Sequence, residues 1–396
     1  MKLLRCYLLL LVAFAAAVIL TAMIPHRAIE DNCQASIAYV AGQDEYPQAF
    51  GLPLLKTDNF TDLLMLGEAW VSDDTRPVEA SMMNFFYLPE GRSLFDASHE
   101  LITHPVEQLQ LTEYSRYWHG FQIVLRPLLV VADYSRLILA NYILLTLLAL
   151  WCLHDLWRLC SPSASILFGI VLLLVAFPAV PLCFQYSVCF YIMFLFVIAL
   201  LRSDGIRRQE VCSFFTVGAL TAFFDLLTTP LLTLGVPLLV YLGVKEKEAG
   251  NLKHTIRLSV SWVSGYAALW LSKCLVAWLL TGHNILGPFM EEVLLRSSLG
   301  LNIVRRLIMS HPILCTLTLF LGAALAFLVF RWARRNAFLS RNGWLLFVAA
   351  MPLIWYAALL QHSFIHFLFV WRILAITIMA LLLLSPLYRK TLNCKP

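Results

Sequence analysis

The sequence predicts an all-α polytopic membrane protein of about ten transmembrane helices with a large first extracytoplasmic loop. Of its 396 residues, 60% are hydrophobic and only 13% are charged, whereas soluble domains carry about 25% charged residues. The apolar residues also gather in continuous runs, and about 20 such residues suffice for one helix to cross the hydrocarbon core. Transmembrane β-barrels alternate apolar and polar residues instead, so these runs indicate helices.

The N-terminal third of the chain divides into two parts. Residues 1–24 form the first transmembrane helix. Lys2 and Arg5 precede its apolar run, and no convincing small-x-small cleavage site follows it. Residues 25–136 form an extracytoplasmic loop with interfacial helices. Its stretch 25–118 holds 15 of the 24 acidic residues, which is too many for a simple connection. The stretch 121–133 is too short and too charged to span a membrane and suits an interfacial helix.

Residues 137–396 form a transmembrane helical bundle. The expected spans are 137–153, 164–181, 184–201, 211–228, 230–244, 257–280, 312–330, 344–360 and 367–385. Every loop that would then face the cytoplasm is basic, as the positive-inside rule requires, so both termini are expected inside the cell. The formal net charge of +5 follows this loop pattern and forms no basic face for nucleic acid.

Two aspartates begin the list of candidate functional residues. Asp58 and Asp62 lie four residues apart in "TDNFTDLLML", and in a helix this spacing would stack both carboxylates on one face. Like charges at that distance mildly oppose a helix, so a second role is expected to favour them. A plain helix-capping role is the competing interpretation.

A third carboxylate lies at membrane depth. Asp225 in "FFDLLTTPLLTLGVP" falls where two predicted spans meet in a broken hairpin, and a carboxylate at this depth is costly enough to indicate a functional site. The alternative is that Asp225 only satisfies backbone N–H groups at a helix end. Lys273 is expected to extend its ammonium to the interface.

Histidine and arginine side chains gather at the same outer pole. His362 and His366 are four residues apart in "LLQHSFIHFLFVWR", and Arg372 follows inside an apolar stretch where a guanidinium needs an anion or a carboxylate. The histidine pair has zinc-ligand spacing, but no HExxH glutamate accompanies it, so protease chemistry is unsupported. Interfacial histidines without a ligand remain the alternative. Arg116 and His119 in "YSRYWHG" belong to the same pole.

An acidic outer loop directly after the first span, followed by a helical bundle, resembles the GT-C superfamily of integral membrane glycosyltransferases. In that superfamily an acidic residue of the first outer loop serves the reaction, and Asp58 best matches that place, with Asp62 beside it and "QDEY" as a rival. The segments "FFDLLTTP" and "QHSFIHFLFVWR" are similar to motifs of uncharacterised bacterial multi-pass membrane proteins.

The resemblance implies transfer of a sugar from a polyprenyl-phosphate carrier to an acceptor on the extracytoplasmic side. Asp58 and Asp62 are the expected catalytic residues, because the acceptor hydroxyl needs a base. The expected substrate-binding residues are Arg116, His119, Arg126, Asp225, His362, His366 and Arg372, with the cations facing the phosphate. The implied location is the bacterial inner (plasma) membrane, and membrane lipid is the expected partner.

Two other functions stay open. A transporter or flippase for a lipid-linked or small solute would need no chemistry, although the polar residues gather at one pole and no internal repeat is visible. A membrane O-acyltransferase is suggested by "WHG", but His119 comes early in the chain. A divalent cation between Asp58 and Asp62 is a further alternative, and the sequence leaves the metal unknown.

Overall fold

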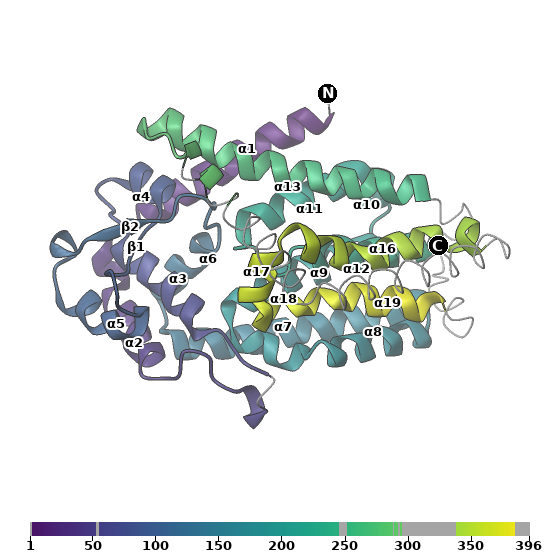
Figure 1. The fold of residues 1–396 in the computed structure, drawn as a ribbon, viewed down its shortest axis with the longest axis horizontal. Coiled ribbons are helices and arrows are strands. Elements are labelled where there is room, and N and C mark those ends of the chain that lie inside the picture. The colour runs from purple at the N-terminus through teal and green to yellow at the C-terminus, as the bar shows by residue number, and fades with distance from the viewer. Residues whose placement is uncertain are drawn as a thin grey trace, which may run out of the picture.

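The structure is a computed structural model that describes residues 2–52, 55–244, 252–287, 289–291, 294 and 338–384. It is mostly helical (Figure 1). Five helical segments are long and apolar enough to cross a membrane, namely Lys2–Ala22, Tyr134–Cys160, Phe184–Arg202, Leu252–Thr281 and Phe367–Leu384. Their number and composition are those of a multi-pass membrane protein.

A helix lies at each predicted span within the described residues, although the span predicted at 164–181 breaks after residue 174 and short helices occur between spans. The helices of the bundle are α1 (Lys2–Ala22), α7 (Tyr134–Asp155) with the π-turn η3 (Leu156–Cys160), α8 (Pro162–Leu174), η4 (Phe177–Leu182), α9 (Phe184–Arg202), α10 (Asp204–Arg208), α11 (Glu210–Phe224), α12 (Leu232–Val244), α13 (Leu252–Thr281), α16 (Phe338–Ala358), α17 (Leu360–Ile365), α18 (Phe367–Val370), η6 (Trp371–Ile373) and α19 (Leu374–Leu384). Among them α8, α11, α12 and α16 are shorter apolar helices. The span expected at 312–330 lies outside the described residues.

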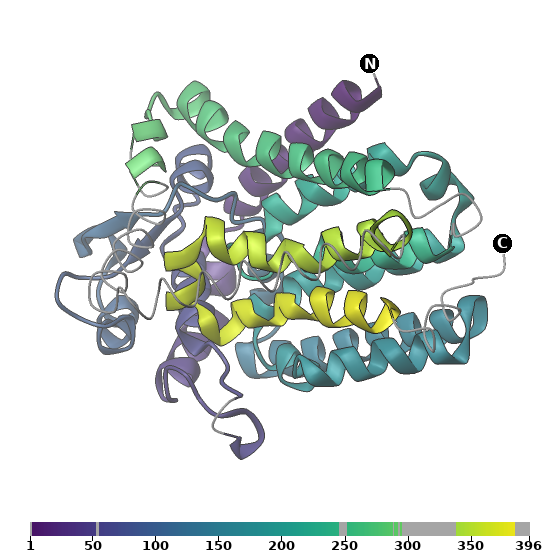
Figure 2. The same cartoon turned by 45° about the vertical axis from the view of Figure 1, so that its right-hand side comes forward.

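The segment between α1 and α7, here called the cap, forms a separate layer at one end of the bundle (Figures 1 and 2). It contains α2 (His26–Ala41), η1 (Ala49–Gly51), α3 (Asn59–Val71), α4 (Pro77–Met83), β1 (Phe85–Tyr87), α5 (Leu94–Thr103), η2 (Val106–Gln108), β2 (Leu111–Glu113) and α6 (Gln122–Leu129). The strands pair antiparallel, with Phe85 opposite Glu113. The bundle helices run lengthwise away from the cap.

Helix α3 is the centre of the cap. Its apolar run "LLML" is buried, and Leu63 and Leu66 share a hydrophobic cluster with Ile29 and Cys33 of α2. The helix is therefore enclosed on nearly all sides, and the polar side chains that it carries are buried with it. Those buried polar groups need hydrogen-bond partners. Together with their partners they form two polar regions, one near each end of α3.

Helices α11 and α13 are held together by glycines. A Cβ atom on Gly218 would lie 2.0 Å from the carbonyl oxygen of Trp262, and one on Gly265 would lie 2.0 Å from that of Phe215. The two backbones therefore touch, as small residues allow in membrane helices. This contact fixes α13 beside α11, and the C-terminal half of α13 then packs on α4 of the cap.

Candidate functional site

Asp58 lies at the first of two polar regions that α3 brings to the junction of cap and bundle. It is the N-cap residue of α3 and precedes the helix, so the capping interpretation of Asp58 is confirmed. Its carboxylate accepts hydrogen bonds only from Thr61 in the described part of the chain, from the backbone N–H at 2.9 Å and the hydroxyl at 2.7 Å. Burial raises the pKa of Asp58 above the usual aspartate value, although the bonds from Thr61 oppose the shift.

Asp62 joins the cap to the bundle. Its carboxylate accepts hydrogen bonds from the backbone N–H groups of Phe184 at 3.0 Å and Gln185 at 3.2 Å, which open α9, and from the Tyr134 hydroxyl at 2.6 Å. Burial raises the pKa of Asp62 to about 6, even though these bonds favour the ionised form. Because both oxygens already accept N–H or O–H groups, Asp62 acts as a remote N-cap for α9.

Arg372 lies buried on the other side of the start of α9. Its guanidinium carbon is 4.5 Å from the centre of the Tyr186 ring, and its Nη1 donates to the Leu368 carbonyl at 3.0 Å. No carboxylate among the described residues forms an ion pair with Arg372, and its buried Nε atom has no hydrogen-bond partner there. The sequence from 293 to 396 contains no aspartate or glutamate, so a counter-ion must come from an earlier segment or from a ligand.

The two histidines connect Arg372 to the broken hairpin. The rings of His362 and His366 lie 4.6 Å apart, and the ring of His366 stacks on Phe369 at 5.2 Å. The Nε2 atom of His362 lies 2.8 Å from the carbonyl oxygen of Leu227. Leu227 has a φ of 70°, a left-handed conformation that is uncommon for leucine. His362 thus contacts the loop that follows α11, and His366 packs on His362 and Phe369.

Asp225 begins that loop. It is the C-cap residue of α11, and its carboxylate accepts the backbone N–H of Thr228 at 3.0 and 3.1 Å and the Thr228 hydroxyl. The helix break predicted at this position is confirmed. The local bonds fit the turn-capping interpretation of Asp225 rather than a separate binding role.

These contacts place the N-terminal end of α3, the start of α9, the 225–231 loop and residues 359–373 next to one another. We call the set Asp58, Asp62, Tyr186 and Arg372 the junction cluster. Tyr186 lies at its centre, because its hydroxyl donates to the Lys56 carbonyl at 3.4 Å while its ring contacts Arg372. The remaining predicted residues, Arg116, His119 and Arg126, lie elsewhere.

The second polar region contains a residue that the sequence analysis missed. Glu68, in the C-terminal half of α3, places Oε2 2.8 Å from Nδ1 of His119, and Nε2 of His119 lies 2.8 Å from the Tyr114 carbonyl oxygen. The side chains of His119 and Glu68 are 0% and 3% exposed. A carboxylate within the apolar run "LMLGEAWV" was the available signal.

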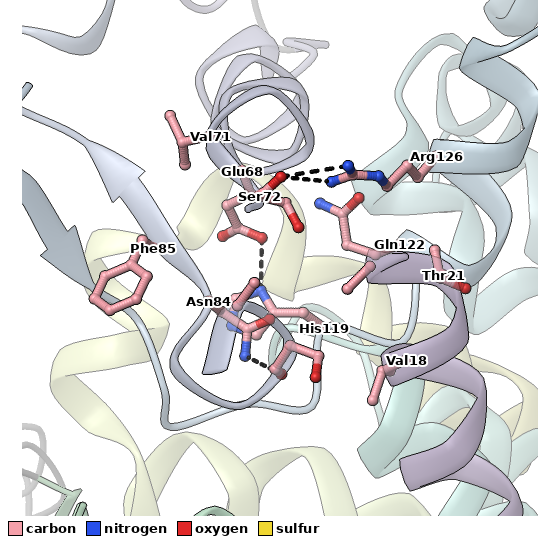
Figure 3. Close-up of a pocket in the computed structure, with 13 residues that line it drawn as sticks. Val18, Thr21, Glu68, Val71, Ser72, Asn84, Phe85, His119, Gln122 and Arg126 are labelled. Carbon is pink, nitrogen blue, oxygen red and sulfur yellow. Dashed lines mark hydrogen bonds and ion pairs between the residues drawn. The ribbon is translucent and has the colours of Figure 1, made fainter. Parts of the chain in front are cut away.

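Glu68 and His119 line a recess between α1, α3, α4 and α6, with a cavity volume of about 30 Å³ (Figure 3). Gln122 and Arg126 line its other side. The two Nη atoms of Arg126 donate to backbone carbonyls at 2.7–3.3 Å, namely those of Ile24, Ala69 and Ser72. Burial lowers the pKa of Arg126. Arg126 therefore links the C-terminal end of α3 to the residues that follow α1 through these hydrogen bonds.

Two other cations lie beside this region. Arg116 stacks on Tyr114, with its guanidinium carbon 4.3 Å from the ring centre, and does not line the recess. Lys273 does not reach the interface as predicted: it is fully buried and donates to the Ser81 carbonyl at 3.0 Å. The prediction failed because α4 of the cap covers this end of α13 and supplies the carbonyl.

No family model, curated protein or solved structure matches this chain. The site must therefore be interpreted from its own chemistry. Over the part of the chain that the structure describes, no group of three or more histidine, cysteine, aspartate or glutamate side chains could hold a metal ion. In the junction cluster, Asp58 can accept a proton and Arg372 can bind an anion, so the cluster carries the groups for acid–base and phosphate chemistry.

Proposed function

We propose that this protein is a GT-C-like glycosyltransferase of the bacterial inner membrane, with about ten spans and an extracytoplasmic cap. It would move a sugar from a polyprenyl-phosphate carrier to an acceptor hydroxyl. The observation that carries the proposal is the arrangement of Asp58 and Arg372 around the start of α9, where a buried carboxylate and a buried guanidinium both lie near Tyr186. A transfer from a lipid phosphate needs these two groups.

The proposed reaction assigns one role to each group. Asp58 takes the proton of the acceptor hydroxyl while the hydroxyl oxygen bonds to the anomeric carbon of the sugar. The bond between that carbon and the phosphate oxygen breaks, and the electron pair leaves on the phosphate. Arg372 stabilises this anion, for which its planar N–H groups are suited. Asp62 is a positioning residue, since it fixes the start of α9 and with it Tyr186.

The raised pKa of Asp58 supports its role as the base. A carboxylate that is harder to ionise is a stronger base, and an effective general base has a pKa near the working pH. Each Asp58 oxygen accepts one bond from Thr61 and retains a lone pair. Asp62 differs, because backbone and tyrosine donors occupy its oxygens. The base role therefore falls to Asp58.

The proposal can be tested with purified protein in lipid nanodiscs and a panel of synthetic polyprenyl-phosphate sugars, measuring release of the polyprenyl phosphate. We expect Asp58→Asn to lower turnover by roughly 10²-fold or more through loss of the base. Arg372→Lys should also lower turnover, because lysine lacks the planar fork. Asp133→Asn is the matched control, because Asp133 also N-caps a helix, α7, but its side chain is only partly buried, with 25% of it exposed.

Asparagine is as good an N-cap as aspartate. A role for Asp58 limited to capping thus predicts that Asp58→Asn behaves like Asp133→Asn, and full turnover in a well-folded Asp58→Asn protein would reject the base assignment. The transporter or flippase alternative has its own signature. Labelled lipid would cross the bilayer of a proteoliposome without any release of the carrier phosphate.

A further inference from the structure

The recess at Glu68 lies apart from the junction cluster and contains neither Asp58 nor Arg372. We infer that the recess binds the vicinal-diol edge of a neutral saccharide, and that it forms the acceptor subsite of this protein. This inference names the acceptor class and rests on the proposed function. Three features support it. They are the number of protons that the Glu68–His119 pair holds, three buried polar atoms that have no hydrogen-bond partner among the described residues, and the size and charge of the recess.

The hydrogen bonds of His119 fix the proton count of the pair. A backbone carbonyl only accepts hydrogen bonds, so the His119 Nε2 that faces the Tyr114 carbonyl carries a proton. The other bond, from Nδ1 to Glu68 Oε2, holds one further proton between the two side chains. The Glu68–His119 pair is then neutral as a whole, wherever that proton resides.

Three buried polar atoms at the recess have no hydrogen-bond partner among the described residues: Glu68 Oε1, Gln122 Oε1 and Arg126 Nε. All three residues line the recess. Figure 3 shows Glu68 on α3 and the other two, one helical turn apart, on α6. Leaving buried polar groups unpaired costs free energy, so a ligand or ordered water that meets all three is favoured.

The pattern of donors and acceptors selects the ligand. Two of the atoms are acceptors and one is a donor, as a pair of neighbouring hydroxyl groups requires, since each hydroxyl both donates and accepts. A fully ionised phosphate or carboxylate offers no proton to the oxygens of Glu68 and Gln122, and both oxygens need a donor. The charge of Arg126 is already directed at backbone carbonyls through its Nη atoms. A neutral polyol therefore fits better than an anion.

The size of the recess limits how much of the ligand enters. A volume of about 30 Å³ admits one or two small polar groups, so the edge of a sugar ring fits and a whole ring does not. Val18 and Thr21 of α1 form one wall, and Phe85 of β1 provides an aromatic face. The aromatic ring can contact the apolar C–H face of a saccharide, while the oxygens of Glu68 and Gln122 accept hydrogen bonds from its hydroxyl groups.

The test measures binding by the detergent-solubilised full chain with isothermal titration calorimetry. The probes are methyl glycosides of neutral hexoses, glycerol and inorganic phosphate. We expect a neutral glycoside to bind and phosphate not to compete with it. Glu68→Gln and Gln122→Met should each weaken glycoside binding by roughly tenfold, the effect of one lost hydrogen bond to a buried group. Glu107→Gln, at an exposed glutamate of the cap, is the control and should bind as the wild type does.

Two outcomes would overturn the inference. Tighter binding of phosphate than of any glycoside would identify an anion site. Binding of no probe, or equal glycoside affinity in wild type and in a folded Gln122→Met protein, would mean that the recess holds buried water only. Transfer kinetics separate this inference from the proposed function: Glu68→Gln should raise the KM for the acceptor more than it lowers kcat. If the wild type transfers no sugar, the proposed function fails, and the calorimetry still decides the recess.

Discussion

Replacing Asp62 tests how the cap is attached to the bundle. Asp62→Ala leaves three buried donors without their acceptor, namely the N–H groups of Phe184 and Gln185 and the hydroxyl of Tyr134. At about 1–3 kcal/mol each, this loss amounts to roughly 3–9 kcal/mol. The substitution also removes a buried charge, and this removal stabilises the folded protein. The rise of the Asp62 pKa from 3.8 to about 6 corresponds to a cost of about 3 kcal/mol for that charge.

The net expectation for Asp62→Ala near pH 7.5 is therefore a destabilisation of roughly 3 kcal/mol, with a range from near zero to about 6. Asp62→Asn should stay near the wild type, because asparagine keeps one acceptor oxygen and carries no charge. Equilibrium unfolding in mixed detergent micelles measures both values. Labelling of Cys183, a buried thiol 3.5 Å from Asp62 Oδ1, reports whether the junction itself opens.

The pH dependence gives the sharper test. Because the folded-state pKa is raised, the cost of ionising Asp62 is fully present above about pH 6 and disappears as the pH falls below the unfolded value of 3.8. The wild type should thus gain about 2 kcal/mol relative to Asp62→Asn between pH 7.5 and pH 4.5. The titratable groups that face Asp62 are Asp58, Tyr134 and Cys183, and all are present in both proteins. Parallel pH profiles for the two proteins would refute the reasoning.

Three further predictions concern packing and topology. Gly218→Ala should lower the thermal midpoint, because its Cβ would lie 2.0 Å from the Trp262 carbonyl oxygen, whereas Gly169→Ala, with its nearest atom at 3.9 Å, should not. Gly120→Ala should weaken glycoside binding in calorimetry, because its Cβ would lie 2.4 Å from the Phe223 ring and displace the adjacent His119. In intact cells, a cysteine at Thr75 should react with a membrane-impermeant maleimide, and labelling only after lysis would reverse the topology.

The sequence predicted the positions of the described bundle helices because each is a long apolar run, a property of local composition. It did not predict how polar residues pair, because partners such as Asp62 and the start of α9 are 122 residues apart in the chain. Lys273 was misplaced for the same reason: local hydropathy carries no information about the Ser81 carbonyl above it. Glu68 was not predicted because its partner, His119, lies 51 residues away in the chain.

Helix α3 carries a residue of one polar region at each end. Asp58 caps its start and Glu68 lies ten positions later, which corresponds to about 15 Å along a helix. Because packing encloses the helix between them, the two side chains keep a fixed separation, and a substitution that shifts α3 along its axis would disturb both polar regions at once.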